Sequence, residues 1–143
     1  MPAHQGSDLQ LGEIAMPCVR IATGTWATGF EIKLIEAVQT ALVAAFKIPE
    51  GDRDVVLDLY DENRRIVSAG RSERYTRVEI VGIAARSLET KRALFKAIAD
   101  NLEAVGVPRN ESRIFLIELP PDYWGINGGV LASEADIGFE IKV

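Results

Sequence analysis

The feature that most constrains this fold is an internal repeat. Two stretches, residues 37–59 and 97–119, align along their length with a single gap. The matched positions keep the same residue or the same apolar character: Ala37 with Ala97, Leu42 with Leu102, Ile48-Pro49 with Val107-Pro108, and Leu57 with Leu116. A repeated unit of this length predicts two copies of one supersecondary motif rather than an irregular domain.

Each copy is predicted to run strand, helix, proline turn, strand. Short apolar runs predict strands at 17–22, 55–60, 78–84 and 114–119. Apolar residues at three- and four-residue spacing predict a first helix from Thr28 to Lys47, with Thr28 as N-cap and Glu31 completing a capping box. The second helix is expected after an N-cap at Ser87 and to end at Gly106.

Parallel strands joined by a helix require a right-handed crossover, and two such units can pair in one sheet. The predicted fold class is therefore α/β (α+β), with two fused β-α-β units forming a four-stranded mixed sheet and both helices on one face. The other face also carries apolar residues and needs cover, so we expect a homo-oligomer. The polar stretch 61–76 is predicted to be a loop or a short hairpin.

The domain is expected to begin near Met16. Residues 1–15 are polar and resemble a flexible lead-in, a tag remnant or an over-extended gene start, whereas 16–143 form a single domain. The alternating apolar residues of the last segment, 137–143, predict a final short strand.

Composition excludes several classes of function. The net charge is −5, which disfavours nucleic acid and anionic membranes as partners, and no apolar run reaches the length of a membrane span. Cys18 is the one cysteine; it is expected to be a buried, inert thiol, and the chain to be cytoplasmic. The one histidine, His4, lies in the lead-in, so a Ser-His-Asp set, a metal cluster and a nucleotide loop all lack parts.

Four segments resemble the tautomerase superfamily (4-oxalocrotonate tautomerase / malonate semialdehyde decarboxylase-like), and the turn at 49–53 resembles its malonate semialdehyde decarboxylase-like branch in particular. They are Met16-Pro17-Cys18-Val19-Arg20-Ile21, the turn Pro49-Glu50-Gly51-Asp52-Arg53, and Tyr123-Trp124-Gly125-Ile126-Asn127-Gly128-Gly129, with Ala85-Arg86-Ser87-Leu88 resembling the family's strand-end arginine and helix start. The resemblance implies a homotrimer without metal or organic cofactor, in which an N-terminal proline is the general base and arginines bind the carboxylate of a small-molecule substrate.

Pro17 is the candidate base under one chemical condition. An α-amino group has a pKa of about 7.7–8.0, and burial lowers it further, which suits proton transfer at neutral pH. In the printed sequence Pro17 follows Met16, and an amide nitrogen there has no useful basicity. Three readings stay open: translation starts at Met16 and that Met is removed, Pro2 becomes the free terminus instead, or Pro17 is inactive.

Asp52 and Arg86 are the other catalytic candidates. The resemblance implies that Asp52 assists the chemistry or positions water, although an aspartate also caps turns routinely. Arg86 would bind the substrate carboxylate or stabilise the enolate; the alternative is an ion pair with Glu89 or another acidic neighbour. The related branch carries a second arginine where this chain has Ala84.

Further substrate-binding candidates are Arg71, Arg74 and Trp124. The two arginines could supply the charge that is missing at Ala84, and Trp124 would line a pocket wall or pack at a subunit interface. The leading prediction is a cofactor-independent tautomerase or isomerase of small 2-oxo or enol acids. The alternatives are a hydratase-type dehalogenase or decarboxylase of a three-carbon acid and, if Pro17 is internal, a non-catalytic oligomeric binding protein.

Overall fold

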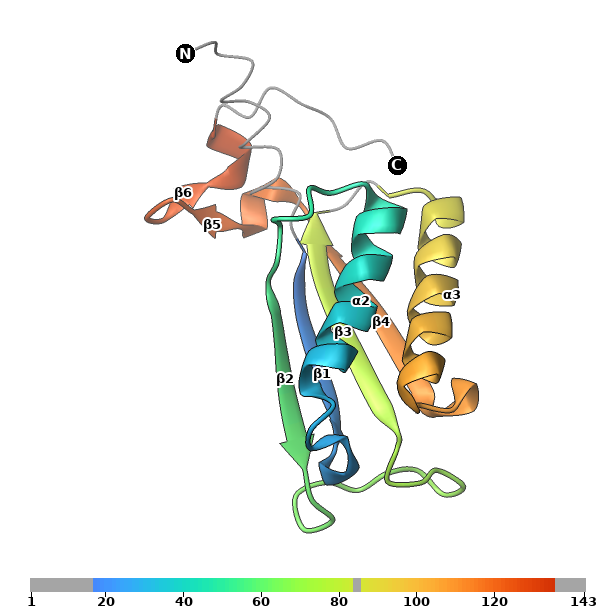
Figure 1. The fold of residues 1–143 in the computed structure, drawn as a ribbon. Helices are drawn as coiled ribbons and strands as arrows, with labels where there is room; N and C mark the ends of the chain where they lie inside the picture. Colours follow the sequence, from blue (N-terminus) through green and yellow to red (C-terminus); the bar gives the residue numbers. More distant parts are fainter. Residues whose placement is uncertain (1–16, 84–85, 136–143) are drawn as a thin grey trace.

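The computed structural model describes residues 17–83 and 86–135. Its body is one four-stranded sheet with two helices lying across one face (Figure 1). The strands are β1 (Cys18–Gly24), β2 (Val55–Tyr60), β3 (Thr76–Ile83) and β4 (Ser112–Leu119), and the helices are α2 (Glu31–Phe46) and α3 (Leu88–Val105). The predicted fold class of two β-α-β units in a mixed sheet is confirmed.

The sheet has the order β2-β1-β3-β4. Strands β1 and β2 pair in parallel, as do β3 and β4, whereas β1 and β3 are antiparallel at the centre. One end of the sheet therefore holds the starts of β1 and β2 with the ends of β3 and β4. The loop 61–75 lies at the opposite end (Figure 1), and it contains no strand, which settles the choice between a loop and a hairpin.

After β4 the chain forms a short appendage. It consists of the 3-10 turn η3 (Pro121–Tyr123), the two-stranded hairpin β5 (Gly125–Ile126) and β6 (Val130–Leu131), and the turn η4 (Ala132–Glu134). This appendage projects from the sheet end where β1 begins (Figure 1). The predicted lead-in 1–15, Ala84 and the strand predicted at 137–143 lie outside the described residues.

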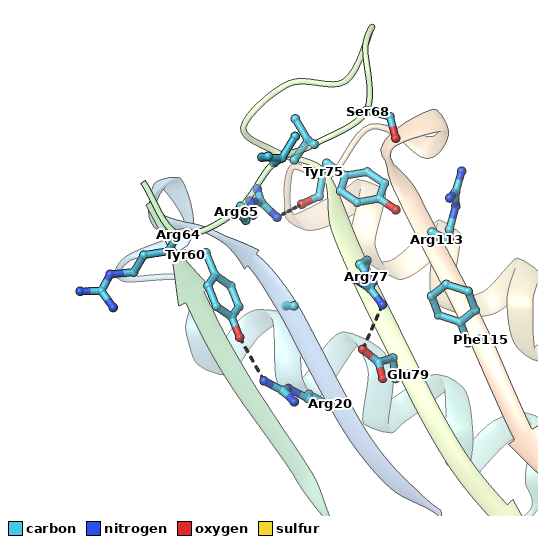
Figure 2. A pocket seen from close by; sticks show the side chains of 13 residues that line it. Arg20, Tyr60, Arg64, Arg65, Ser68, Tyr75, Arg77, Glu79, Arg113 and Phe115 are labelled. Atoms are coloured by element: carbon cyan, nitrogen blue, oxygen red, sulfur yellow. Dashed lines mark hydrogen bonds and ion pairs between the residues drawn. The ribbon is translucent and has the colours of Figure 1, made fainter. Parts of the chain in front are cut away.

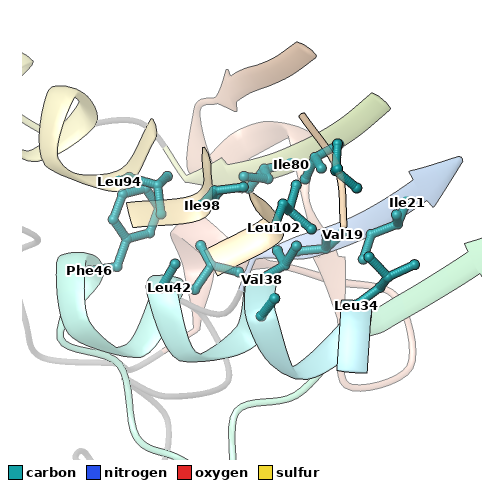
Figure 3. Close-up of a cluster of buried hydrophobic side chains, with 14 of the residues drawn as sticks. Val19, Ile21, Leu34, Val38, Leu42, Phe46, Ile80, Leu94, Ile98 and Leu102 are labelled. Atoms are coloured by element: carbon teal, nitrogen blue, oxygen red, sulfur yellow. The ribbon is translucent and has the colours of Figure 1, made fainter. Parts of the chain in front are cut away.

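The hydrophobic core fills the layer between the sheet and the two helices (Figure 3). Repeat-related residues occupy equivalent places in it: Leu34 and Leu94, Val38 and Ile98, and Leu42 and Leu102 are all fully buried. Strands β1 and β3 add Val19, Ile21, Val78 and Ile80 from below. The three- and four-residue spacing of the helices and the alternation of the central strands thus converge on one apolar layer.

The predicted N-cap of the first helix is wrong. A 3-10 turn, η1 (Thr25–Ala27), precedes α2, and Phe30 occupies the cap position without a side-chain hydrogen bond. The Thr28 hydroxyl donates instead to the Thr25 carbonyl at 2.7 Å. The Glu31 carboxylate accepts a hydrogen bond from the Gly29 N–H at 2.8 Å. In a capping box this carboxylate bonds the N–H of the N-cap residue, so here only that bond forms, and it goes to the residue after Thr28.

The caps of α3 are confirmed. The Ser87 hydroxyl oxygen accepts from the Thr90 N–H at 3.1 Å. At the other end Gly106 has a φ of 121° and donates its N–H to the Leu102 carbonyl. A side chain is strained at such a positive φ, which explains a glycine there.

The face of the sheet turned away from the helices is open within one chain. Cys18, expected to be buried, lies exposed on this face because β1 alternates with Val19 and Ile21 facing the helices. Val56, Phe115 and Ile117 are exposed on neighbouring strands. None of the helices in the described ranges has the length and apolar character that crossing a membrane requires.

Candidate active site

The predicted catalytic residues meet at one end of the sheet. Pro17 immediately precedes β1, Asp52 precedes β2, Arg86 follows β3, and Trp124 follows β4. Because β1 and β2 start where β3 and β4 end, all four lie at the sheet end that carries the appendage (Figure 1). The chain crossings thus bring together residues that are more than a hundred positions apart in sequence.

Pro17 is held by the strand that it opens. It is buried, and the next paired residue, Val19, donates its N–H to the Asp54 carbonyl at 2.9 Å. On the other side Cys18 pairs with Val81, so one step further Pro17 lies beside Gly82. An amine at this position would be partly withdrawn from water, which lowers its pKa.

Asp52 lies in a turn that α2 fixes. Its N–H donates to the Pro49 carbonyl at 3.0 Å, which closes the turn. Its own carbonyl accepts from the Nε2 of Gln39 at 2.6 Å. Gln39 is buried on α2, so a helix side chain sets the place of the Asp52 backbone.

Arg86 is buried between the end of α2 and the start of α3. Its Nη1 donates to the Phe46 carbonyl at 3.1 Å, and its guanidinium lies 4.2 Å from the centre of the Phe46 ring. The carbonyl is one of those left unpaired at a helix C-terminus, where positive charge is favourable. Burial lowers the pKa of Arg86, and the nearby charge of Glu118 partly offsets that shift.

Glu118 is a charged residue of this end that the sequence reasoning did not single out. Its carboxylate pairs with the Lys91 Nζ at 2.6 Å and accepts from the Arg86 N–H at 3.4 Å. Glu118 is thus an acidic neighbour of Arg86, which is the second of the two alternatives left open for an ion pair with Glu89 or another acidic residue. The alternation of β4 could have identified Glu118. Ile114 and Leu116 face the helices, and the same alternation places the carboxylate of residue 118 on that face.

Trp124 anchors the appendage to the sheet. Its indole Nε1 donates to the Leu119 carbonyl at 3.2 Å, and its ring packs with Ile126 against the buried residues Ile83 and Ala132. Tyr123, by contrast, is exposed. Trp124, which was predicted to line a pocket wall or pack at a subunit interface, therefore lies at the sheet end that holds Arg86, in a small apolar cluster separate from the main core.

Arg71 and Arg74 lie at the opposite end of the sheet. Arg71 donates to the Asn110 carbonyl, and Arg74 donates to the Gly106 carbonyl at 2.9 Å and stacks on the Trp26 ring at 4.5 Å. Within one chain the structure does not bring these two arginines to Pro17. They tie the loop 61–75 to the segment that follows α3.

Comparisons with known proteins agree with this arrangement. The sequence profile of a family described as tautomerase enzyme matches residues 52–127. The structure of FG41 malonate semialdehyde decarboxylase inhibited by 3-bromopropiolate is 28% identical, with a TM-score of 0.72 over 84% of this chain and 98% of that one. A fused 4-OT described as a symmetric trimer is also 28% identical, with a TM-score of 0.67 over 84% of this chain and 98% of the other.

A second malonate semialdehyde decarboxylase, studied for its decarboxylase and hydratase activities, shares the fold. Its TM-score is 0.70 at 21% identity, over 80% of this chain and 93% of that one.

Proposed function

Because the chain belongs to the tautomerase enzyme family, we propose that it is a cofactor-independent tautomerase of small 2-oxo or enol acids, with Pro17 as general base. The observation that carries the proposal is the placement of Pro17. It is buried at the start of β1, at the sheet end that also holds Asp52 and Arg86. The proposal requires that the chain is translated from Met16 and that this methionine is removed.

The proposed chemistry is one proton moved from oxygen to carbon. The Pro17 lone pair takes the proton of the enol hydroxyl, and the C=O bond forms as the C=C electron pair accepts a proton at carbon 3. A secondary amine whose pKa lies near the working pH can both take and return that proton. Arg86 has five N–H donors, of which one goes to Phe46, and a carboxylate matches two of the others side by side.

The first test is the mature N-terminus and its effect on rate. Mass spectrometry of the native protein should find Pro17 as the first residue. Phenylenolpyruvate ketonisation should then fall by about 10²–10⁴-fold in Pro17→Ala, which loses a positioned base. The matched control is the chain produced from Met1 with its N-terminus retained, which keeps every side chain and loses only the amine.

Two outcomes would contradict the proposal. One is native protein with intact chain upstream of Pro17, which leaves a non-catalytic binding protein as the better account. The other is an equal rate in Pro17→Ala and in the parent. Because Pro2 is the alternative free terminus, Pro2→Ala should leave the rate unchanged.

A second candidate activity is that of a hydratase-type dehalogenase or a decarboxylase of a three-carbon acid, with Asp52 activating water. It is favoured by the 28% identity to a malonate semialdehyde decarboxylase and by the fixed turn around Asp52. Ala84, where the related branch has an arginine, weighs against it. Product analysis with malonate semialdehyde and with 3-chloroacrylates tests it; an unchanged product yield in Asp52→Asn would remove the case for water activation.

We also propose that the chain assembles as a homotrimer through the open face of the sheet. Val56, Phe115 and Ile117 are exposed there, and a fused 4-OT of the same fold is described as a symmetric trimer. Apolar side chains on one face of a sheet are normally covered by a second layer. Any role of Arg71 or Arg74 at the Pro17 site would have to come from a neighbouring copy.

A further inference from the structure

The ion pair of Glu118 with Lys91 is the least exposed one among the residues that the structure describes. It joins β4 to the start of α3 over 2.6 Å, and the two side chains are only 19% and 30% exposed. By contrast, the pair of Arg77 with Glu79 spans 3.5 Å with side chains that are 50% and 35% exposed (Figure 2). An exposed ion pair contributes little, whereas a pair withdrawn from water couples its two groups strongly.

Glu118 lies in the row of residues that crosses the sheet at the Pro17 end. It is the register partner of Gly82 on β3, and Gly82 lies beside Pro17 in the antiparallel register of β1 with β3. Neighbouring strands are about 4.8 Å apart, so the backbones of Glu118 and Pro17 are about 10 Å apart. Glu118 is therefore two strands away from the proposed base, at the sheet end that also holds Arg86.

The Glu118 carboxylate contacts two neighbouring parts of the chain. Its Oε1 pairs with the Lys91 Nζ, and its Oε2 accepts from the Arg86 N–H at 3.4 Å. The Lys91 N–H in turn donates to the Ser87 carbonyl at 3.0 Å, within the first turn of α3. A carboxylate beside a helix N-terminus also interacts favourably with the helix dipole. Glu118 thus ties β4 to the turn that carries Arg86 and to the helix that follows it.

Arg86 is consequently held at two points. Its side chain is fixed by the carbonyl and the ring of Phe46 at the end of α2, and its main chain is fixed by Glu118. Burial lowers the pKa of the Arg86 guanidinium, and the negative charge of Glu118 offsets part of that shift. A guanidinium anchored in this way presents its remaining N–H donors in a defined direction, which suits two-point binding of a carboxylate.

We infer that Glu118 is a positioning residue for Arg86, and that its ion pair with Lys91 holds it in place. The inference rests on the proposed function, in which Arg86 binds the substrate carboxylate. Glu118 does not touch the substrate in this account; it fixes the main chain from which the guanidinium extends. Because paired N–H donors must match both carboxylate oxygens, a small displacement of Arg86 weakens the contact.

The test compares two substrates in Glu118→Gln. The kcat/KM for ketonisation of phenylenolpyruvate should fall about tenfold, because the carboxylate contact is misaligned. The kcat/KM for its methyl ester, which offers no carboxylate to Arg86, should change by less than about twofold. Lys91→Gln removes the same ion pair and should give the same selective loss, whereas Lys91→Arg keeps the charge and should retain the parent's kcat/KM. A purely structural role would slow the acid and the ester equally.

The matched control is Asp100→Asn, which removes the acidic partner of an exposed ion pair on α3. Asp100 pairs with Lys96 at 2.9 Å, and both side chains are exposed. This variant should leave kcat/KM unchanged for both substrates. Circular dichroism and Tm show whether each variant is folded. If Glu118→Gln does not fold, Lys91→Gln tests the same ion pair from its other end.

Calorimetric titration with phenylpyruvate separates this inference from the proposed function, because it measures the carboxylate contact without turnover. Glu118→Gln should bind phenylpyruvate about tenfold more weakly than the parent. If that difference is found but Pro17→Ala keeps the parent's rate, the proposed function fails and the positioning role stands. If Glu118→Gln matches the parent in affinity and in kcat/KM, or slows the acid and the ester equally, the positioning role fails alone. A parent that neither binds phenylpyruvate nor ketonises the enol contradicts both.

Discussion

Cys18 is exposed, but its thiol is expected to react slowly. Its pKa is raised to about 11, first by partial burial and then by the hydrogen bond and the negative charge of Asp54. A thiol must lose its proton to react, and at pH 8 a pKa near 11 leaves only about a thousandth of it ionised. The expectation of an unreactive thiol therefore rests on partial burial together with Asp54, although Cys18 is exposed rather than fully buried.

Alkylation kinetics test this account. Iodoacetamide should label Cys18 far more slowly at pH 8 than it labels glutathione, and the rate should climb steeply above pH 10. Asp54→Asn removes the negative charge and should speed labelling at pH 8, because a lower pKa leaves more of the thiol ionised. Cys18→Ser is the blank, since the chain has no other cysteine; labelling as fast as glutathione would refute the raised pKa.

Glu111 is predicted to make stability depend on pH. Burial alone would raise the pKa of its carboxyl group, but bonds from the Ser72 N–H and hydroxyl, with the charges of Arg71 and Arg74, lower it overall. A folded pKa below the unfolded value gives stability that is present above the unfolded pKa, about 4.3, and is lost as pH falls through the folded value.

Urea unfolding at pH 7 and at low pH measures this contribution. Glu111→Gln should lose about 1.5–3 kcal/mol of unfolding free energy at pH 7, the range for hydrogen bonds to a charged group. The difference from the parent should shrink as the pH drops below about 4. Glu62→Gln, a change of the same charge at an exposed loop position, should match the parent throughout, and a constant difference across pH for Glu111→Gln would exclude the ionic explanation.

Among the elements, the two helix starts show what local sequence can and cannot predict. Ser87 and Thr28 both have the right chemistry for an N-cap, but only Ser87 accepts a helix N–H. In the extra turn η1, Trp26 donates its Nε1 to the Thr23 hydroxyl oxygen at 3.0 Å and lies beneath Arg74. The Arg74 contact comes from a segment distant in sequence, and no local pattern around Thr28 encodes it.

This difference gives a matched pair of substitutions. Ser87→Ala should cost about 1 kcal/mol of unfolding free energy, the usual value of a lost N-cap. Thr28→Ala should cost less than about 0.5 kcal/mol, because its hydroxyl satisfies no N–H of α2. Urea unfolding at one protein concentration compares the two directly, and equal losses would show that the cap assignments are wrong.

For the whole molecule, repeat and periodicity were sufficient to predict the sheet and both helices. Pro17, Asp52 and Arg86 were singled out by the family resemblance, and their position at one end of the sheet is known only from the structure. The place of Arg71 and Arg74 follows from the parallel pairing of β1 with β2, since the loop 61–75 begins after Tyr60, at the end of the sheet away from Pro17. Glu118 was missed because its neighbours Arg86 and Lys91 belong to other elements.

The proposed assembly has a matched test of its own. Ile117→Lys places a charge on the open face of the sheet and should convert the trimer to monomers at micromolar concentration, since an unpaired buried charge costs several kcal/mol. Ile32→Lys makes the same change at an exposed position of α2 and should leave the assembly intact. Size-exclusion chromatography with light scattering measures the molar mass of both variants. An intact trimer in Ile117→Lys would show that the subunit contact does not lie on the open face.

The pairing pattern also relates the two ends of the sheet by an approximate twofold rotation. Val19 pairs with Val55 as Val78 pairs with Ile114, so the rotation that exchanges the units carries Pro17 onto Thr76. The nitrogen of Thr76 lies in mid-chain and can never be a terminal amine. Two units joined in one polypeptide therefore hold at most one such base, where two separate units would hold two.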